Sequence, residues 1–198
     1  MYRLRSSFAV GGLVALACLA GPRPAAAQAT SAIGCTPTAK VEGRASPYDS
    51  TDVTVGGRVA RVCYSRPSMR GRTIFGGLVP YDTLWRTGAN EPTIVHLPVA
   101  ATIAGIAVPA GSYSLYTVPG RDEWTVIVNR STSQWGIESQ YTPAVRAQEV
   151  GRARVKSEPI AAPVDTFTIR SLPAAGGAAD LVLEWEKTRV RIPVKPAG

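Results

Sequence analysis

The sequence predicts an all-β fold, an antiparallel two-sheet sandwich or a jelly-roll-like arrangement of about nine strands. Short runs in which apolar and polar residues alternate recur along most of the chain, a pattern typical of strands with one buried face. Gly, Pro, Asn and Asp separate these runs, and no stretch has apolar residues at helical spacing. An open barrel is the structural alternative.

The first expected strands lie in the amino-terminal two thirds of the domain. They cover residues 52–55, 58–65, 93–97 and 101–108, the last with a turn or bulge at Gly105. Residues 112–118 and 123–129 flank the turn sequence Pro119-Gly120-Arg121-Asp122 and predict a hairpin.

Further strands are expected at 152–156 and 164–171, followed by the clearest pattern in the chain. Leu181, Leu183 and Trp185 alternate with their neighbours, and a second alternating run covers 189–194. Residues 186–188, Glu-Lys-Thr, are predicted to form the turn between these two runs, which gives a hairpin with one apolar and one polar face.

The amino terminus predicts export. Arginines at positions 3 and 5 precede an apolar run at 8–20, and the small residues Ala25-Ala26-Ala27 follow, so residues 1–27 are interpreted as a signal peptide. The run is too short to span a membrane, and no later segment is apolar enough. A less favoured interpretation makes Cys18 a lipoprotein processing site. Residues 28–45 are predicted to be a flexible leader, and 46–196 a single β-sandwich domain in the periplasm or outside the cell.

The net charge does not indicate a nucleic-acid partner. Removal of Arg3, Arg5 and Arg23 with the signal peptide lowers the formal charge from +8 to +5. The remaining arginines are scattered, without the basic block that follows a phosphate backbone.

Two cysteines of the predicted mature chain, Cys35 and Cys63, are candidates for a disulfide, because export places them where such a bond persists. Alternation in 58–65 directs Cys63 away from the more apolar side, where an amino-terminal segment crossing the strand would meet it. Two unpaired thiols, or a Cys35 in a disordered leader, are the alternatives.

Several stretches of this chain resemble one known family. They are Tyr64-Ser65-Arg66-Pro67, Gly71-Arg72, Ile74-Phe75-Gly76-Gly77-Leu78-Val79-Pro80-Tyr81, Trp85-Arg86-Thr87-Gly88-Ala89-Asn90-Glu91, Pro109-Ala110-Gly111-Ser112-Tyr113, Trp124-Thr125-Val126-Ile127 and Leu183-Glu184-Trp185-Glu186. Residues 45–194 resemble the bacterial exported family called domain of unknown function 2911. The resemblance implies no activity. Members often have a histidine soon after the Ser-Pro that opens the domain, whereas Ser46-Pro47 is followed here by Tyr48-Asp49, so no role for it carries over.

The loop 65–91 is the candidate ligand site, since it concentrates arginines, glycines and polar side chains. Guanidinium groups bind carboxylate or phosphate through paired donors, and glycines let backbone N–H groups approach a ligand. The candidate ligand-binding residues are Arg66, Arg72, Trp85, Arg86, Asn90 and Glu91. The alternative is a structural clamp, in which Arg66 or Arg86 pairs with Glu91 or Asp82 and caps loop carbonyls.

The sequence favours a non-enzymatic module that binds a small polar or anionic ligand or a cell-envelope partner. The alternative function is an uncharacterised hydrolase, acting on glycans or esters, that uses Glu91 with a second carboxylate. His96 falls within an expected strand and there is no G-x-S-x-G elbow, so serine hydrolysis is disfavoured. No spaced ligand set for a metal and no phosphate or dinucleotide fingerprint is present, so neither metal nor cofactor is expected.

The tryptophans divide into two groups. Trp124 and Trp185 alternate with the apolar side of their expected strands and are predicted to lie in the core. Trp85 and Trp135 have loop-like surroundings, and Trp135 is the better candidate for a partly exposed ring.

Overall fold

The structure is a computed structural model that describes Met1 and residues 34–198. Most of the predicted signal peptide, including Cys18, and the first residues of the predicted leader therefore lie outside the described residues. Within the described part of the chain, no helix is long and apolar enough to cross a membrane.

The described residues form nine strands with three short helical segments, and the all-β prediction is confirmed. The strands are β1 (Tyr48–Val55), β2 (Arg58–Ser65), β3 (Thr93–Leu97), β4 (Ala101–Ile103), β5 (Ile106–Val108), β6 (Gly111–Val118), β7 (Glu123–Asn129), β8 (Glu149–Pro173) and β9 (Ala179–Pro196). The helical segments are η1 (Glu138–Gln140), α1 (Pro143–Arg146) and η2 (Ala175–Gly177).

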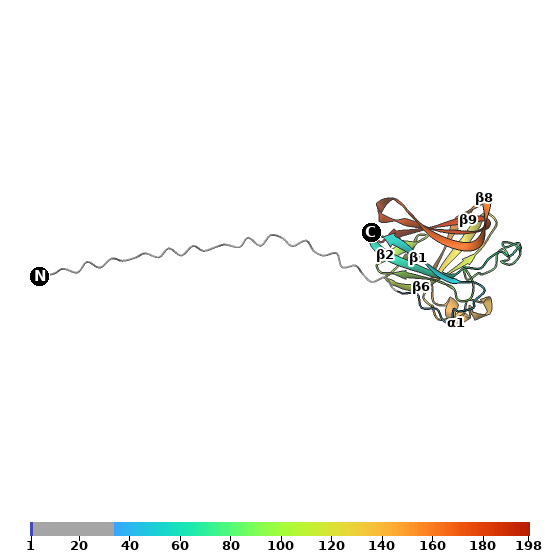
Figure 1. Ribbon diagram of the computed structural model, residues 1–198, viewed down its shortest axis with the longest axis horizontal. Helices are drawn as coiled ribbons and strands as arrows, with labels where there is room; N and C mark the ends of the chain where they lie inside the picture. Colours follow the sequence, from blue (N-terminus) through green and yellow to red (C-terminus); the bar gives the residue numbers. More distant parts are fainter. Residues whose placement is uncertain (2–33) are drawn as a thin grey trace.

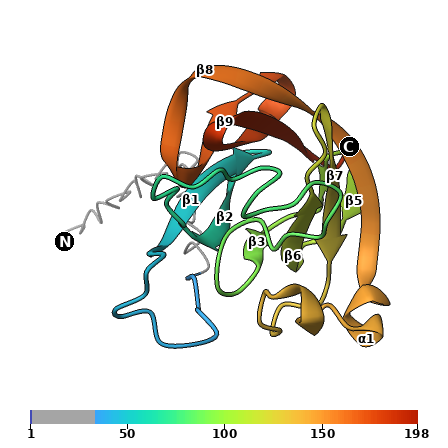
Figure 2. The same cartoon turned by 90° about the vertical axis from the view of Figure 1, so that its right-hand side faces the viewer.

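All nine strands belong to one antiparallel sheet, in the order β1-β2-β3-β6-β7-β8-β9-β4-β5. The predicted two-sheet sandwich is not confirmed, because the long strand β8 is shared: its first part pairs with β7 and its remainder with β9. Figure 2 shows β8 arching over β1, β2 and β9. Hydrogen bonds from Thr51 Oγ1 to the Ile169 carbonyl and from Gly56 N to the Gly177 carbonyl tie the far part of this curled sheet to β1.

The hairpin expected at 112–129 is confirmed as β6–β7. The single strand expected at 101–108 is instead the short hairpin β4–β5, with the turn at Gly105. The hairpin turn predicted at 186–188 is wrong, because β9 runs through these residues and pairs with β8 along both halves. Register shifts between Pro159, Val164 and Thr168 leave extra residues on β8, and Glu186 has a φ of 54°. Such bulges bend a ribbon without ending it, and the Glu-Lys-Thr sequence contains no glycine or proline that would force a turn.

The core lies inside the curl of the sheet, where aromatic side chains from distant parts of the chain meet. Trp124 and Trp185 are 2% and 1% exposed, as predicted. The ring of Trp85 stacks on Trp185 with centroids 5.8 Å apart, and Phe75 and Phe167 pack edge-on against Trp85. Trp85 is therefore a core residue at 4% exposure, whereas Trp135 is partly exposed, as expected.

The amino-terminal segment 34–47 is attached to the sheet by the predicted disulfide. Cys35 and Cys63 are bonded with their Cα atoms 5.7 Å apart, which confirms the prediction. The ribbon views show this segment as a loop that leads into the start of β1 (Figures 1 and 2). Residues 34–45, assigned above to a flexible leader, thus run against the domain and contact the loop between β2 and β3.

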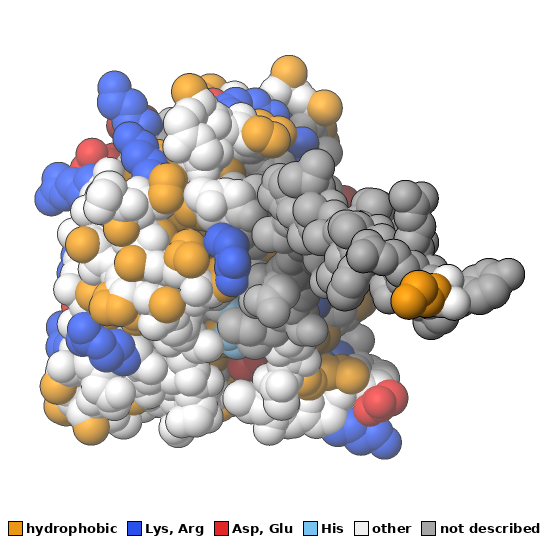
Figure 3. Space-filling model, turned by 90° about the vertical axis from the view of Figure 1, so that its left-hand side faces the viewer, with side chains coloured by type: hydrophobic (Ala, Val, Ile, Leu, Met, Phe, Trp, Pro, Cys, Tyr) orange, Lys and Arg blue, Asp and Glu red, His pale blue; other side chains and the backbone are white. Residues whose placement is uncertain are grey.

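Charged side chains are spread over the surface. On the face drawn in Figure 3, Lys and Arg form separate groups among uncharged atoms and make no continuous basic band. Many arginines are paired, including Arg61 with Asp52, Arg154 with Glu123, and Arg170 and Arg189 with Glu184.

Candidate functional site

The candidate site is built on the connection 66–92 between β2 and β3. Its backbone is fastened at both ends: Met69 N donates to the Asp165 carbonyl, and Trp85 exchanges two hydrogen bonds with Thr117 on β6. Four residues that are not glycine have a left-handed φ here, namely Arg70, Asp82, Thr87 and Asn90. Such conformations are costly, most of all for a β-branched threonine, and cluster at binding sites. The loop is therefore ordered and strained.

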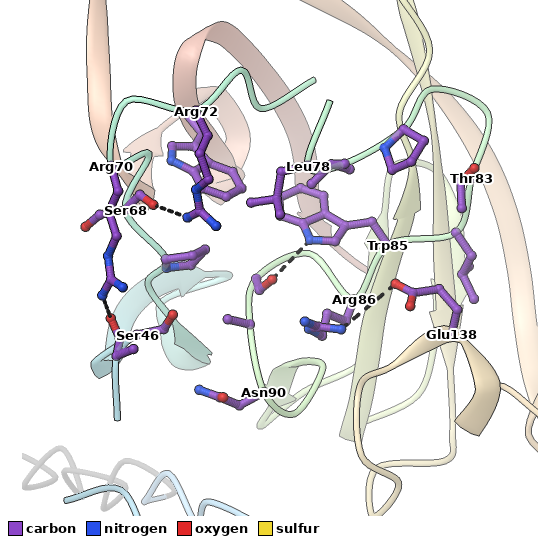
Figure 4. Close-up of a pocket in the computed structure, with 18 residues that line it drawn as sticks. Ser46, Ser68, Arg70, Arg72, Leu78, Thr83, Trp85, Arg86, Asn90 and Glu138 are labelled. Carbon is purple, nitrogen blue, oxygen red and sulfur yellow. Dashed lines mark hydrogen bonds and ion pairs between the residues drawn. The ribbon is translucent and has the colours of Figure 1, made fainter. Parts of the chain in front are cut away.

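A cleft of about 540 Å³ opens between this loop, η1 and the start of the domain. Of the six predicted site residues, Arg72, Trp85, Arg86 and Asn90 line it, whereas Arg66 and Glu91 do not. Its wall also contains Ala45, Ser46, Pro67, Ser68, Arg70, Leu78, Val79, Pro80, Thr83, Leu84, Gly88, Ala89, Glu138 and Trp185. In Figure 4, Arg70 and Arg72 lie on one side of the cleft and Arg86 with Glu138 on the other.

Arg66 is a structural residue. Its Nη1 bonds Asp49 Oδ2 at 3.0 Å, its Nε bonds the Phe167 carbonyl at 3.2 Å and its Nη2 bonds Thr168 Oγ1 at 2.9 Å. These bonds join β2, β1 and β8. The clamp interpretation therefore describes Arg66, with Asp49 as its partner.

Glu91 is buried beneath the loop, at 2% exposure, and its partner is Arg44 from the amino-terminal segment. Arg44 Nη1 lies 2.7 Å from Glu91 Oε2, and Thr38 N donates to Oε1 at 3.3 Å. Burial raises the pKa of the nearby Tyr48 to about 12, and the Glu91 carboxylate adds to the effect. The clamp alternative allowed Arg66 or Arg86 to pair with Glu91, and neither pairing occurs.

The two arginines on one side of the cleft are partly engaged with the backbone. Arg72 donates from Nε to the Met69 carbonyl and from Nη2 to the Ser68 carbonyl. Arg70 donates from Nη2 to the Ala45 carbonyl, which joins the loop to the amino-terminal segment. Both side chains therefore stiffen the rim of the cleft while keeping their positive charge beside it.

Arg86 differs from the other arginines because its hydrogen-bonding capacity is not used. Its Nε is buried and has no partner, the one such side-chain nitrogen or oxygen in the part of the chain that the structure describes. Its Nη1 lies 3.9 Å from Glu138 Oε1, which is too long for a hydrogen bond. A buried donor without an acceptor costs free energy, and the guanidinium group of Arg86 has donors left for a further oxygen acceptor.

Close packing holds Arg86 in this position. Gly136 N donates to the Asn90 carbonyl at 3.0 Å, and a Cβ at Gly136 would collide with the Arg86 side chain and the Asn90 carbonyl. The Asn90 amide donates from Nδ2 to Ser65 Oγ at 3.2 Å. The indole N–H of Trp85 donates to the Gly88 carbonyl, so Trp85 contributes an apolar wall and no free donor.

The glycines at 76 and 77 do not form the anion-binding backbone that the sequence suggested. Gly76 N donates to the Val79 carbonyl and Gly77 N to the Ile74 carbonyl. A Cβ at Gly76 would lie 2.7 Å from the Tyr81 ring, so this glycine serves packing. The amides of Ile74 and Phe75 do bind an anion, but it is the carboxylate of Glu186 on β9, at 3.2 Å from each.

Other groups considered in the sequence lie apart from the cleft. His96 Nδ1 is 2.7 Å from Ser112 Oγ on the sheet, and burial lowers the His96 pKa, with Arg61 adding to the effect. Neither His96 nor Ser112 lines the cleft. Among the described residues there is no group of three or more His, Cys, Asp and Glu side chains that could hold a metal ion.

A model of the family described as "Protein of unknown function (DUF2911)" matches residues 46–194 of this chain. The chain belongs to this family. A search of curated proteins and a search of solved structures found no match.

The matched region of this DUF2911 protein includes every residue of the cleft wall except Ala45. Cys35 and Arg44, which fasten the amino-terminal segment, lie before it. The cleft is thus formed almost wholly by the family domain.

Fourteen residues that line the cleft were not among the predicted site residues, and three of them show why. Glu138 is far from the loop in sequence and carries no motif, and Ser46 belongs to the Ser-Pro that opens the domain, which the sequence did not connect with the loop. Leu78 is 47% exposed, and its position in a glycine-rich turn was the available hint that its side chain faces outward.

Proposed function

We propose that this protein binds a small polar or anionic ligand in the cleft formed by the loop 66–92. The observation that carries the proposal is Arg86, which lines a cleft of about 540 Å³ and whose guanidinium group makes no hydrogen bond within the described residues. Ligand pockets commonly have volumes of about 300–1,000 Å³ and orient their ligand with few polar groups. The strained backbone at Thr87 and Asn90, on either side of Gly88, supports the same conclusion.

The charge of the cleft wall favours an anion. Three arginines line it, and Glu138 is the one carboxylate among the described lining residues. A glycosidase needs two carboxylates across the cleaved bond, and the buried Glu91 is held by Arg44 outside the cleft. The geometry therefore supports binding better than hydrolysis.

A thermal-shift screen of small polar and anionic compounds tests this function. A ligand at about 100 times its dissociation constant should add about 2.7 kcal/mol of stability to the wild-type protein. Arg86→Ala should lose this gain. Arg154→Ala, which removes an exposed arginine that does not line the cleft, should keep it. Hits that stabilise all three proteins equally would refute the assignment of the site.

We also infer that the protein is exported to the periplasm or the extracellular space. The Cys35–Cys63 disulfide supports this, because such bonds persist in oxidising compartments. Mass spectrometry of protein from its host should find an amino terminus near Gln28 or Thr30, and a lipid-modified Cys18 would contradict ordinary signal-peptide cleavage.

A further inference from the structure

The wall of the cleft combines a cationic part with an apolar part. Arg72 and Arg86 lie on different sides of it in Figure 4, and Trp85 forms part of the wall. The apolar part is made by Leu78, Val79, Pro80, Leu84, Trp85 and Trp185. A ligand that satisfies both parts has an anionic head and an apolar body.

Among the three arginines that line the cleft, Arg86 is the one whose side chain makes no hydrogen bond to the part of the chain that the structure describes. Arg72 uses Nε and Nη2 on backbone carbonyls, and Arg70 uses Nη2. Arg86 Nε has no acceptor, and its Nη1 has only the distant Glu138. One guanidinium edge binds two oxygens of one planar group, and this is the geometry of a carboxylate.

A phosphate is a poorer match for the cleft. Phosphate sites commonly use several backbone N–H groups, but the amides of Gly76 and Gly77 are bonded within their own turn. Those of Ile74 and Phe75 are occupied by Glu186. A doubly charged anion would also be repelled more strongly than a singly charged one by the Glu138 carboxylate, which lies 3.9 Å from Arg86 Nη1.

We infer that the ligand class is a small monocarboxylate with an apolar body, whose carboxylate displaces Glu138 from Arg86. This inference rests on the proposed function of the cleft. Glu138 is 52% exposed and lies 3.9 Å from Arg86 Nη1, so it pairs with the guanidinium group loosely and can be displaced by another carboxylate. The apolar body lies against Leu78 and Leu84, and the exposed part of the Leu78 side chain becomes covered.

Isothermal titration calorimetry with hexanoate, phenylacetate and phenylpropionate, each compared with its neutral amide, tests the ligand class. At least one acid should bind, and its amide should bind at least about tenfold more weakly, because charge-assisted paired hydrogen bonds are lost. Arg86→Gln should weaken binding of the acid by a similar factor. Arg154→Gln is the matched control and should leave it unchanged.

The variant Glu138→Gln tests the displacement. It should strengthen binding of the acid about two- to fivefold, the range that corresponds to an exposed ion pair. Unchanged or weaker binding would overturn this part, and amides that bind as well as the acids would overturn the ligand class.

Binding measurements with inorganic phosphate and with the compounds of the thermal-shift screen distinguish failure of the ligand class from failure of the proposed function. If phosphate or a polar compound binds in an Arg86-dependent way while no carboxylate does, the proposed function stands and the ligand class fails. If nothing binds in an Arg86-dependent way, both fail.

Discussion

Two arginine–glutamate pairs flank the same short stretch of the loop, and they differ in almost every physical respect. Arg44 and Glu91 are 2.7 Å apart with side chains 9% and 2% exposed. Arg86 and Glu138 are 3.9 Å apart with side chains 23% and 52% exposed. The first pair is completed by Thr38 N, whereas the second leaves Arg86 Nε without a partner.

This difference separates scaffold from site within one loop. A buried pair with short bonds resists change, because removal of one partner leaves a charge without compensation. A loose, half-exposed pair contributes little to stability and leaves its arginine open to another anion. Residue type alone did not distinguish them, since both are arginine with glutamate.

The largest effect is expected for Arg44→Ala. The variant leaves the buried Glu91 carboxylate unpaired, so the free energy of unfolding at neutral pH should fall by about 3 to 5 kcal/mol. Chemical denaturation measures it. Arg44→Met with Glu91→Gln removes both charges and should recover much of this loss. A loss below about 1 kcal/mol in Arg44→Ala would mean that the pair does not hold the loop.

An intermediate effect is expected for Glu184, which is 6% exposed and bonded to Arg170 and Arg189. Burial raises the pKa of Glu184, but the two arginines outweigh burial and hold that pKa below its usual value. Its stabilisation is therefore present above the unfolded pKa and is lost as the pH falls through the folded pKa.

The variant Glu184→Gln should lose roughly 1 to 3 kcal/mol at neutral pH, the range for hydrogen bonds to a charged group. Denaturation curves from neutral pH downward should show the difference from wild type shrinking once the pH is below about 4. A difference that stays constant with pH would show that the ionised carboxylate is not its source.

The smallest effect is expected for Arg86→Ala. Its partner Glu138 is half exposed and the buried Nε is unsatisfied, so the free energy of unfolding should stay within about 0.5 kcal/mol of wild type. Chemical denaturation measures this free energy, with Arg66→Ala as the comparison variant. Each of the three guanidinium nitrogens of Arg66 donates a hydrogen bond within the protein. A loss as large as that of Arg66→Ala would make Arg86 part of the clamp and end its assignment as a ligand group.

The sequence predicted local features well. Alternation identified the strands and the core positions of Trp124 and Trp185, and the export interpretation favoured the disulfide between Cys35 and Cys63. The curl of one sheet was not predictable, because it depends on bulges in β8 that alternation does not reveal. The partners of the charged residues could not be predicted from the sequence either. Arg44, Glu138 and Glu186 contact the loop but are distant from it in sequence.

Strand β9 lies in the interior of the sheet, and this position affects the order in which the protein can fold. The strand follows the other eight described strands in the sequence, yet it lies between β8 and β4 and supplies Trp185 to the aromatic core. An emerging chain therefore lacks one wall of its core until β9 has been synthesised, and its pairings join residues far apart along the chain, which slows folding. Until β9 has paired, the Trp85 side of the cleft has no support, so a binding-competent loop should appear only as a late event in folding.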